Sequence, residues 1–257
     1  MMKDGPASTA LEQISAATPW SSTLPPLECG DEPRLSTCPI GAFIFDVDGV
    51  LADTAALHTT AWRRLAKEEG FVFDEAIAEE LRGLSRDDSL RRLLNGRQLT
   101  ADRFTELLDR KNGYYLADLK HLHERVVMPG VRLLLAGLRE LGIKLAAASL
   151  SRNARQVLLG TGLVADFDVI VDGTDLSESR MGLSRFHLIA RALRVDPGRC
   201  VVVEDSTAGI AAARAAGMRS IGVGSYDRLC AATLVLDSLR GMDAGTLVYW
   251  LGHRNHP

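Results

Sequence analysis

Several features are missing from this sequence, and each absence excludes a class of protein. No apolar run approaches the roughly 18 residues that a membrane helix needs, and the first residues, MMKDGPASTALEQ, lack the apolar segment of a secretory signal. The four cysteines have neither CxxC nor zinc-ligand spacing, which favours reduced thiols in a cytoplasmic protein. The formal net charge of −3 argues against nucleic acid or a membrane surface as the partner.

Short apolar runs alternate with helical patterns through most of the chain. Continuous apolar runs separated by amphipathic helices are typical of a parallel sheet that is covered on both faces. The sequence therefore predicts an α/β fold. The expected strands are 42–45, 144–149, 167–171, 200–203 and 220–224, with 233–236 as a weaker sixth, and the expected helices are 131–141, 152–161, 184–194 and 206–216.

Two segments depart from this alternation. Residues 1–38 are rich in Pro, Ser and Thr and lack periodicity, so we interpret them as a flexible N-terminal extension. Residues 54–130 contain several helical patterns, which predict a small helical domain, the cap, inserted after the first strand. The α/β core then comprises 39–53 and 131–257, and VVMPGV (126–131) is expected to form a second hinge strand.

Acidic and hydroxyl side chains follow three of the expected strands. Asp46 and Asp48 follow the first strand, Ser149 follows the second, and Glu204 and Asp205 follow CVVV. Ligands of open parallel sheets bind beyond the carboxyl ends of the strands. Carboxylates from separate strands that share a small space suit Mg²⁺, which takes oxygen ligands. A turn-rich acidic loop, or charges that complement a helix dipole, would explain each pair alone, but their combination favours a metal site.

These residues suggest phosphoryl transfer. Asp46 is placed to attack phosphorus and carry the phosphoryl group as an acyl phosphate, and Asp48 is placed to act as general acid and base. Ser149 and the N–H groups of a helix start can bind the phosphoryl oxygens, and Arg180 would neutralise their charge.

The motifs DVDGVLADT, AAASLSRN and VVVEDSTAGI resemble those of the haloacid dehalogenase superfamily and, within it, the β-phosphoglucomutases. The resemblance runs from about residue 42 to 236. It implies a Rossmann-like core with a helical cap, and Mg²⁺ held by Asp46, the backbone carbonyl of Asp48, Glu204 and Asp205. The implied reaction interconverts β-glucose 1-phosphate and glucose 6-phosphate through a bisphosphate. The implied partner is a small phosphorylated sugar, and the family leans towards monomers.

The resemblance also implies roles for substrate-binding residues. In ELRGLSRDDSL, Arg82 would contact the sugar and Arg86 the phosphate farther from the nucleophile. The alternatives are that Arg86 lies on a solvated helix face and that His58 has only a structural role. Lys111 and Asn112 are implied as substrate contacts, His58 as the residue that couples substrate binding to closure of the cap, and Thr54 as a hinge residue. The residues of the core that would bind the phosphate farther from the nucleophile are Ser151, Arg152 and Asn153.

One residue departs from the family pattern. Arg180 stands where the third motif usually has a lysine, and Arg offers a planar fork in place of a point charge. A phosphatase that uses the same residues is the alternative function, with water in place of the second hydroxyl. A signalling receiver domain is disfavoured because receivers lack a helical insertion after the first strand.

Overall fold

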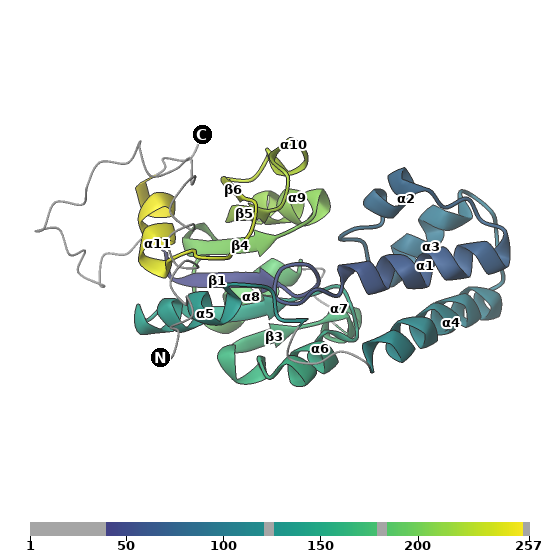
Figure 1. The fold of residues 1–257 in the computed structure, drawn as a ribbon, viewed down its shortest axis with the longest axis horizontal. Helices are drawn as coiled ribbons and strands as arrows, with labels where there is room; N and C mark the ends of the chain where they lie inside the picture. The colour runs from purple at the N-terminus through teal and green to yellow at the C-terminus, as the bar shows by residue number, and fades with distance from the viewer. Residues whose placement is uncertain (1–39, 121–125, 179–183, 254–257) are drawn as a thin grey trace, which may run out of the picture. The chain divides into compact units, whose positions relative to one another are not determined.

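The computed structural model describes residues 40–120, 126–178 and 184–253. Within them, six parallel strands form one sheet in the order β3-β2-β1-β4-β5-β6 (Figure 1). The predicted fold class is confirmed. The predicted N-terminal extension and Arg180 lie outside the described residues. The strands are β1 (Ala42–Asp46), β2 (Lys144–Ala148), β3 (Val169–Val171), β4 (Cys200–Glu204), β5 (Arg219–Val223) and β6 (Leu234–Leu236).

Helices cover both faces of the sheet, which explains why its strands are apolar without alternation. Phe43 and Phe45 belong to an apolar cluster on one face, with side chains of α5 (Val131–Glu140), α6 (Ala154–Thr161) and α11 (Ala244–His253). Ala42 and Ile44 point to the other face and pack with α8 (Arg185–Leu193) and α9 (Thr207–Ala215). The central strand β1 is therefore buried on both sides, and only its carboxyl end reaches a cavity.

Four helices lie between β1 and α5, and we keep the name cap for them: α1 (Ala55–Glu69), α2 (Glu75–Glu80), α3 (Arg86–Leu94) and α4 (Ala101–Leu119). Their apolar faces form a separate cluster that includes Trp62, Leu90 and Leu107. The side chains at the N-caps of α2, α3 and α4 each accept a hydrogen bond from a backbone N–H of the first turn. The cap thus has its own core and its own helix-start signals.

The expected hinge strand at 126–131 is wrong. The structure has a single antiparallel bridge there, between Ala52 and Val127, flanked by hydrogen bonds from Asp53 N–H to the Val126 carbonyl (2.8 Å) and from Met128 N–H to the Leu51 carbonyl (3.0 Å). Pro129 has no N–H to continue a ladder, and Gly130, with φ of 92°, turns the chain into α5. The chain therefore returns from the cap through a single bridge at Val127 and not through a strand.

Three helices were not predicted: α7 (Gly173–Glu178), α10 (Tyr226–Leu229) and α11. Two short 3-10 turns, Val164–Asp166 and Pro197–Arg199, precede β3 and β4. Helix α11 packs through Leu247 and Leu251 into the same apolar cluster as α5. It therefore completes the cover on that face of the sheet.

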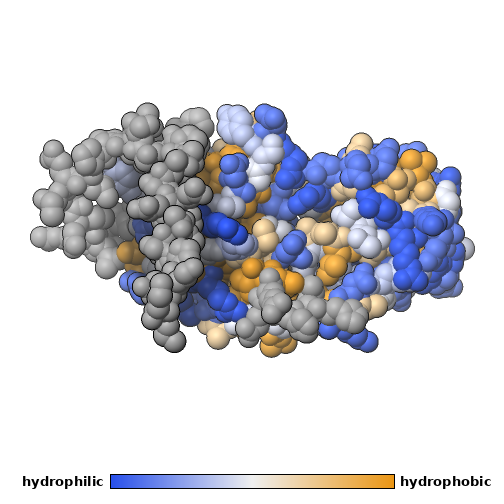
Figure 2. Space-filling model, viewed as in Figure 1, coloured by the Kyte–Doolittle hydropathy of each residue, from blue (hydrophilic) through white to orange (hydrophobic). Residues whose placement is uncertain are grey.

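The surface of the cap is largely hydrophilic. On the face shown in Figure 2, hydrophilic residues predominate over helices α1–α4, and hydrophobic residues form small separate patches. Arg103 and Arg110 each pair with Glu69 at 2.5 Å, which neutralises much of the charge on this part of the cap. In the described ranges, no helix combines the length and apolar character that crossing a membrane requires.

Replacing Gly130 by alanine tests how tightly the return from the cap is packed. An added Cβ would lie 2.1 Å from the Leu239 carbonyl oxygen, whereas at Gly142, which also has positive φ (70°), nothing lies within 4 Å. We expect Gly142→Ala to lower the free energy of unfolding by about 1–2 kcal/mol, the cost of a left-handed backbone. Gly130→Ala should cost about 1–3 kcal/mol more, because backbone must move. Urea unfolding of both variants measures this, and equal losses would contradict it.

Candidate active site

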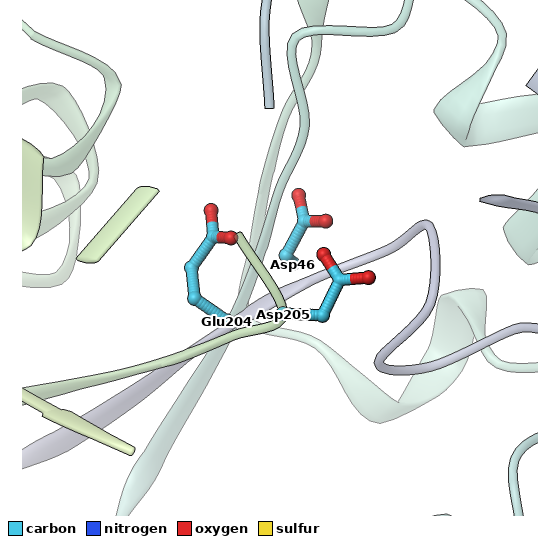
Figure 3. Close-up of side chains that lie close together, drawn as sticks. All are labelled: Asp46, Glu204 and Asp205. Carbon is cyan, nitrogen blue, oxygen red and sulfur yellow. The ribbon is translucent and has the colours of Figure 1, made fainter. Parts of the chain in front are cut away.

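Three carboxylates meet at the carboxyl ends of two adjacent strands. Asp46 ends β1 and Glu204 ends β4, and the two lie side by side because Phe45 pairs with Val203 one residue earlier. One oxygen each from Asp46, Glu204 and Asp205 lies within 4.8 Å of the others. Figure 3 shows the three side chains rising from the strand ends toward a common space. We call these three residues the acid cluster.

The acid cluster fits a divalent cation. Burial, and then the neighbouring charges of Glu204, Asp48 and Asp205, raise the pKa of Asp46 well above its usual value. Burial also raises the pKa of Asp205, although Arg82 partly offsets the rise. The charge of a neighbouring carboxylate contributes to both rises, so the carboxylates repel one another, and a cation between them would remove that repulsion. Three hard oxygen donors from separate positions suit Mg²⁺.

Glu204 is held on both of its oxygens. Arg185 donates from Nη2 to Oε1 at 2.7 Å, and Ser206 donates from its hydroxyl to Oε2 at 2.9 Å. Ser206 also caps α9, because its Oγ accepts the N–H of Gly209 at 3.0 Å. The absence of a side chain at Gly209 leaves the room that the Glu204 carboxylate fills. The sequence ED-S-x-x-G thus positions this carboxylate through the start of a helix.

Asp48 has a different environment from Asp46. Thr54 donates from Oγ1 to Oδ1 at 2.5 Å, and Ser149 donates from Oγ to Oδ2 at 3.4 Å. His58 Nε2 lies 3.4 Å from Oδ1 but is not aligned for a hydrogen bond. Burial acts to raise the pKa of Asp48, but His58, Thr54 and Lys111 outweigh it, so the pKa lies below its usual value. Asp46 and Asp48 therefore differ in proton affinity although they are two residues apart.

His58 connects Asp48 with the cap. Its ring stacks on Tyr115 at 4.1 Å between centroids, and its Nδ1 lies 2.7 Å from Lys111 Nζ. A charged lysine only donates, so Nδ1 accepts and the ring proton lies on Nε2, which faces Asp48. Burial, and then Lys111, lower the pKa of His58. Burial, and then the charge of Arg86, lower the pKa of Lys111 to about 7.

A second group of polar residues joins the cap to the start of α6. Arg86 donates to Asn112 Oδ1 at 2.9 Å, and the amide of Asn153 donates to the same oxygen at 2.8 Å. Burial, and then the charge of Arg152, lower the pKa of Arg86, so two cations face the same region. The residues that the resemblance assigned to the far phosphate are thus brought together, and their role stays a prediction.

The cap also contacts the acid cluster directly. Arg82 donates to Asp205 Oδ2, so the structure places this residue on a carboxylate of the acid cluster. Next to it, Glu79 pairs with Arg228 at 2.6 Å, and Arg228 donates to the Asp205 carbonyl at 3.0 Å. These contacts come from the end of α2 and the segment that follows it, which therefore lie against the loop after β4.

Most of the predicted residues line one cavity between the cap and the strand ends, but not all. Thr54, Asn112, Arg152 and Asn153 lie outside its lining, and Arg180 lies outside the described residues. Sequence reasoning missed Arg185, Thr59 and Ser89, all of which line the cavity. A signal for Arg185 was present, because it shares the buried face of its helix with Ile189 and Leu193. The predicted residues that line the cavity are Asp46, Asp48, His58, Arg82, Arg86, Lys111, Ser149, Ser151, Glu204 and Asp205.

Comparisons with known proteins agree with the motifs. A model of the haloacid dehalogenase-like hydrolase family matches residues 40–217. A β-phosphoglucomutase of Bacillus subtilis is 37% identical over 76% of this chain and 88% of its own length. A phosphorylated carbohydrates phosphatase of Thermotoga maritima is 32% identical over 70% of this chain and 83% of its own. The crystal structure of a β-phosphoglucomutase from Clostridium difficile superposes with a TM-score of 0.77 and 35% identity, covering 82% of this chain and 96% of that one. The predicted resemblance is confirmed.

The pKa of Lys111 predicts a pH dependence of stability. It is about 7 in the folded protein, against about 10.4 in an unfolded chain. Between these values the unfolded chain binds more protons, so stability rises with pH; below pH 7 the full cost of burying the charge remains. We expect the free energy of unfolding, relative to that of Lys111→Met, to rise by about 2–4 kcal/mol from pH 7 to 10. Lys120→Met, at an exposed position of α4's end, is the control and should show no such trend. A flat difference for Lys111→Met would refute the prediction.

Gly209→Ala tests how Glu204 is positioned. The new Cβ would lie 2.0 Å from the Glu204 carboxyl carbon, which must move away. We expect the Mg²⁺ dissociation constant, measured by calorimetry, to rise about tenfold or more. Gly160→Ala in helix α6, where nothing lies within 4 Å, should leave it unchanged. Wild-type Mg²⁺ affinity in Gly209→Ala would show that Glu204 is not a metal ligand.

Proposed function

This chain belongs to the haloacid dehalogenase-like hydrolase family, and on that premise we propose that it moves a phosphoryl group between two positions of a sugar phosphate through an aspartyl phosphate at Asp46. The proposed reaction is the interconversion of β-glucose 1-phosphate and glucose 6-phosphate through a bisphosphate. Two similar proteins that are named β-phosphoglucomutases, from Bacillus subtilis and Clostridium difficile, support this choice of substrate.

One observation supports the choice of a mutase: a second group of polar side chains, apart from the acid cluster, is suited to bind a second phosphate. The group formed by Arg86, Asn112 and Asn153 lies where α3 and α4 meet the start of α6, whereas the acid cluster lies at the ends of β1 and β4. Cations and amide groups of this kind bind phosphate oxygens. A bisphosphate intermediate needs two phosphate sites, and a simple phosphatase needs one.

The acid cluster would hold Mg²⁺ through Asp46, Glu204 and Asp205, with the Asp48 carbonyl as a further ligand, and the bound ion would supply positive charge for the phosphoryl oxygens. An Asp46 oxygen attacks a phosphorus atom of the bisphosphate, the bond from that phosphorus to the sugar oxygen breaks, and Asp48 in its acid form protonates the sugar oxygen, which leaves a sugar monophosphate and the aspartyl phosphate. In the other half-reaction the free hydroxyl of a sugar monophosphate attacks the aspartyl phosphate, the bond from phosphorus to Asp46 breaks, and Asp48 accepts the hydroxyl proton, which forms the bisphosphate again. The lowered pKa of Asp48 keeps its carboxylate ionised at neutral pH, which is the form that accepts the hydroxyl proton.

Water must be kept away from the aspartyl phosphate, because hydrolysis would end the cycle. The cap contacts the rest of the chain at two places near the cavity. At one, Arg82 pairs with Asp205 and Glu79 pairs with Arg228. At the other, Asn112 accepts a hydrogen bond from Asn153. We infer that these contacts exclude water while the phosphoryl group is on Asp46.

A phosphatase is the second candidate. The Thermotoga maritima relative is named as a phosphatase of phosphorylated carbohydrates, and it is 32% identical to this chain. The same Asp46 and Asp48 would then act on water in place of a sugar hydroxyl. The two functions differ in product, so one assay separates them.

The assay supplies β-glucose 1-phosphate, Mg²⁺ and a trace of the bisphosphate, and follows glucose 6-phosphate by a coupled dehydrogenase and inorganic phosphate in parallel. We expect glucose 6-phosphate to form with little phosphate release. Phosphate release without glucose 6-phosphate would defeat the mutase proposal and favour the phosphatase.

Asp48→Ala should lose most turnover in the same assay, by about 10²–10⁴-fold, because a general acid and base is removed. The variant should still fold and bind Mg²⁺, since the acid cluster and the backbone carbonyl of residue 48 remain. Asp53→Ala is the matched control, at an exposed position close by in the chain, and should keep wild-type turnover. Near wild-type turnover in Asp48→Ala would show that this residue is not the acid and base.

A further inference from the structure

Arg185 is a buried cation that lines the cavity, and the proposed reaction has not used it. It is the first residue of α8, its guanidinium packs 4.5 Å from the centroid of the Phe186 ring, and only 8% of the residue is exposed. Its Nη2 pairs with Glu204 at 2.7 Å. It lines the same cavity as Asp46 and Ser149.

The guanidinium has a donor to spare. The Nε atom of Arg185 is buried and has no hydrogen-bond partner among the described residues. Buried donors are nearly always paired with protein, water or a ligand. A guanidinium presents its donors in a planar fork, so one nitrogen can hold Glu204 while another donates to a phosphoryl oxygen. The charge of Arg185 also acts to lower the pKa of Asp46, which indicates that the two groups are close enough to interact.

Arg185 differs from the other cations of the cavity in where it is attached. Among the described residues that line the cavity, the other three, Arg82, Arg86 and Lys111, belong to the cap. Arg185 belongs to α8, whose Phe186 and Ile189 pack against the sheet that carries Asp46. Its distance from Asp46 therefore does not depend on the position of the cap.

We propose that Arg185 is a further phosphoryl-binding residue, which donates to the phosphoryl group carried by Asp46 while it holds Glu204. The family resemblance assigned a phosphoryl-binding cation to Arg180. The inference rests on the proposed aspartyl phosphate at Asp46, and it is independent of which sugar is used and of whether the product is that of a mutase or a phosphatase.

The test uses beryllium fluoride, which binds to an aspartate as a tetrahedral analogue of an aspartyl phosphate. Calorimetry on the full chain gives the Mg²⁺ dissociation constant first, and then that of beryllium fluoride at saturating Mg²⁺. For Arg185→Gln we expect at least a tenfold loss of beryllium fluoride affinity, the scale of a charge-assisted hydrogen bond. We expect Mg²⁺ affinity to stay within about threefold of wild type or to increase, because a competing positive charge is gone.

Arg155→Gln is the matched control. Arg155 also lies on a core helix, α6, and forms ion pairs with Asp172 and Asp175, but it does not line the cavity. Both dissociation constants should equal those of the wild type. Arg180→Gln is measured beside it: a loss in Arg180→Gln with none in Arg185→Gln assigns the contact to Arg180 and overturns the proposal.

Two further results would overturn it. Wild-type beryllium fluoride affinity in Arg185→Gln would show that no contact exists, and a parallel loss of both affinities would show that Arg185 acts only by holding Glu204. Should Arg185→Gln not fold, Arg185→Lys decides, because it keeps the charge and lacks the fork. It is expected to lose at least about fivefold in beryllium fluoride affinity with Mg²⁺ binding retained, and an unchanged affinity contradicts the proposal.

The wild type and Asp46→Asn separate this inference from the proposed function. Beryllium fluoride should bind the wild type only with Mg²⁺, and Asp46→Asn should not bind it. A wild type that fails to bind overturns the aspartyl phosphate and, with it, this inference. A wild type that binds while Arg185→Gln binds equally well overturns the role of Arg185 alone.

Discussion

Three carboxylates at the carboxyl ends of two strands repel one another, two of them buried and Asp46 partly buried, and positive charge reaches them from more than one direction. Parallel pairing of β1 with β4 brings Asp46 and Glu204 to the same edge, so their proximity is built into the fold. Arg185 approaches from a helix of the core, and Arg82 approaches from the cap. The proposed divalent cation would complete the balance. The charge at this edge therefore ties the core helix, the cap and the metal site to one another.

The cations of the cap divide into two sets with different surroundings. Arg103 and Arg110 form ion pairs with glutamates, which satisfies their charge within the cap. Arg86 and Lys111 have only an amide and a histidine as hydrogen-bond partners in the described part of the chain, and burial lowers the pKa of both. The negative charge of an anionic substrate would favour the charged forms of Arg86 and Lys111, which burial disfavours. Arg86 and Lys111 line the cavity and have no carboxylate among these hydrogen-bond partners, which fits the proposed binding of an anionic ligand there.

The strands and the acid cluster were predictable because they follow from strong local signals. An apolar run that ends in acidic residues, found twice, locates Asp46 and Glu204 once the sheet is taken as parallel. Arg185 was not found: its place on the apolar face of α8 was a weak signal, and its pairing with Glu204 at the end of β4 depends on a contact between distant segments. The return segment near Val127 was overestimated as a strand, since its length depends on a pairing partner far away in the sequence. Contacts between distant segments are what the sequence alone does not contain.

The hinge has a consequence for the protonation of Asp48. Ala52 bridges both Asp48 and Val127, and Thr54, the N-cap of α1, donates to the Asp48 carboxylate. The segment that enters the cap and the segment that leaves it thus meet beside Asp48. A movement of α1 would carry the hydroxyl of Thr54 and the ring of His58 away from that carboxylate together. Because both groups lower the pKa of Asp48, its proton affinity is coupled to the position of α1.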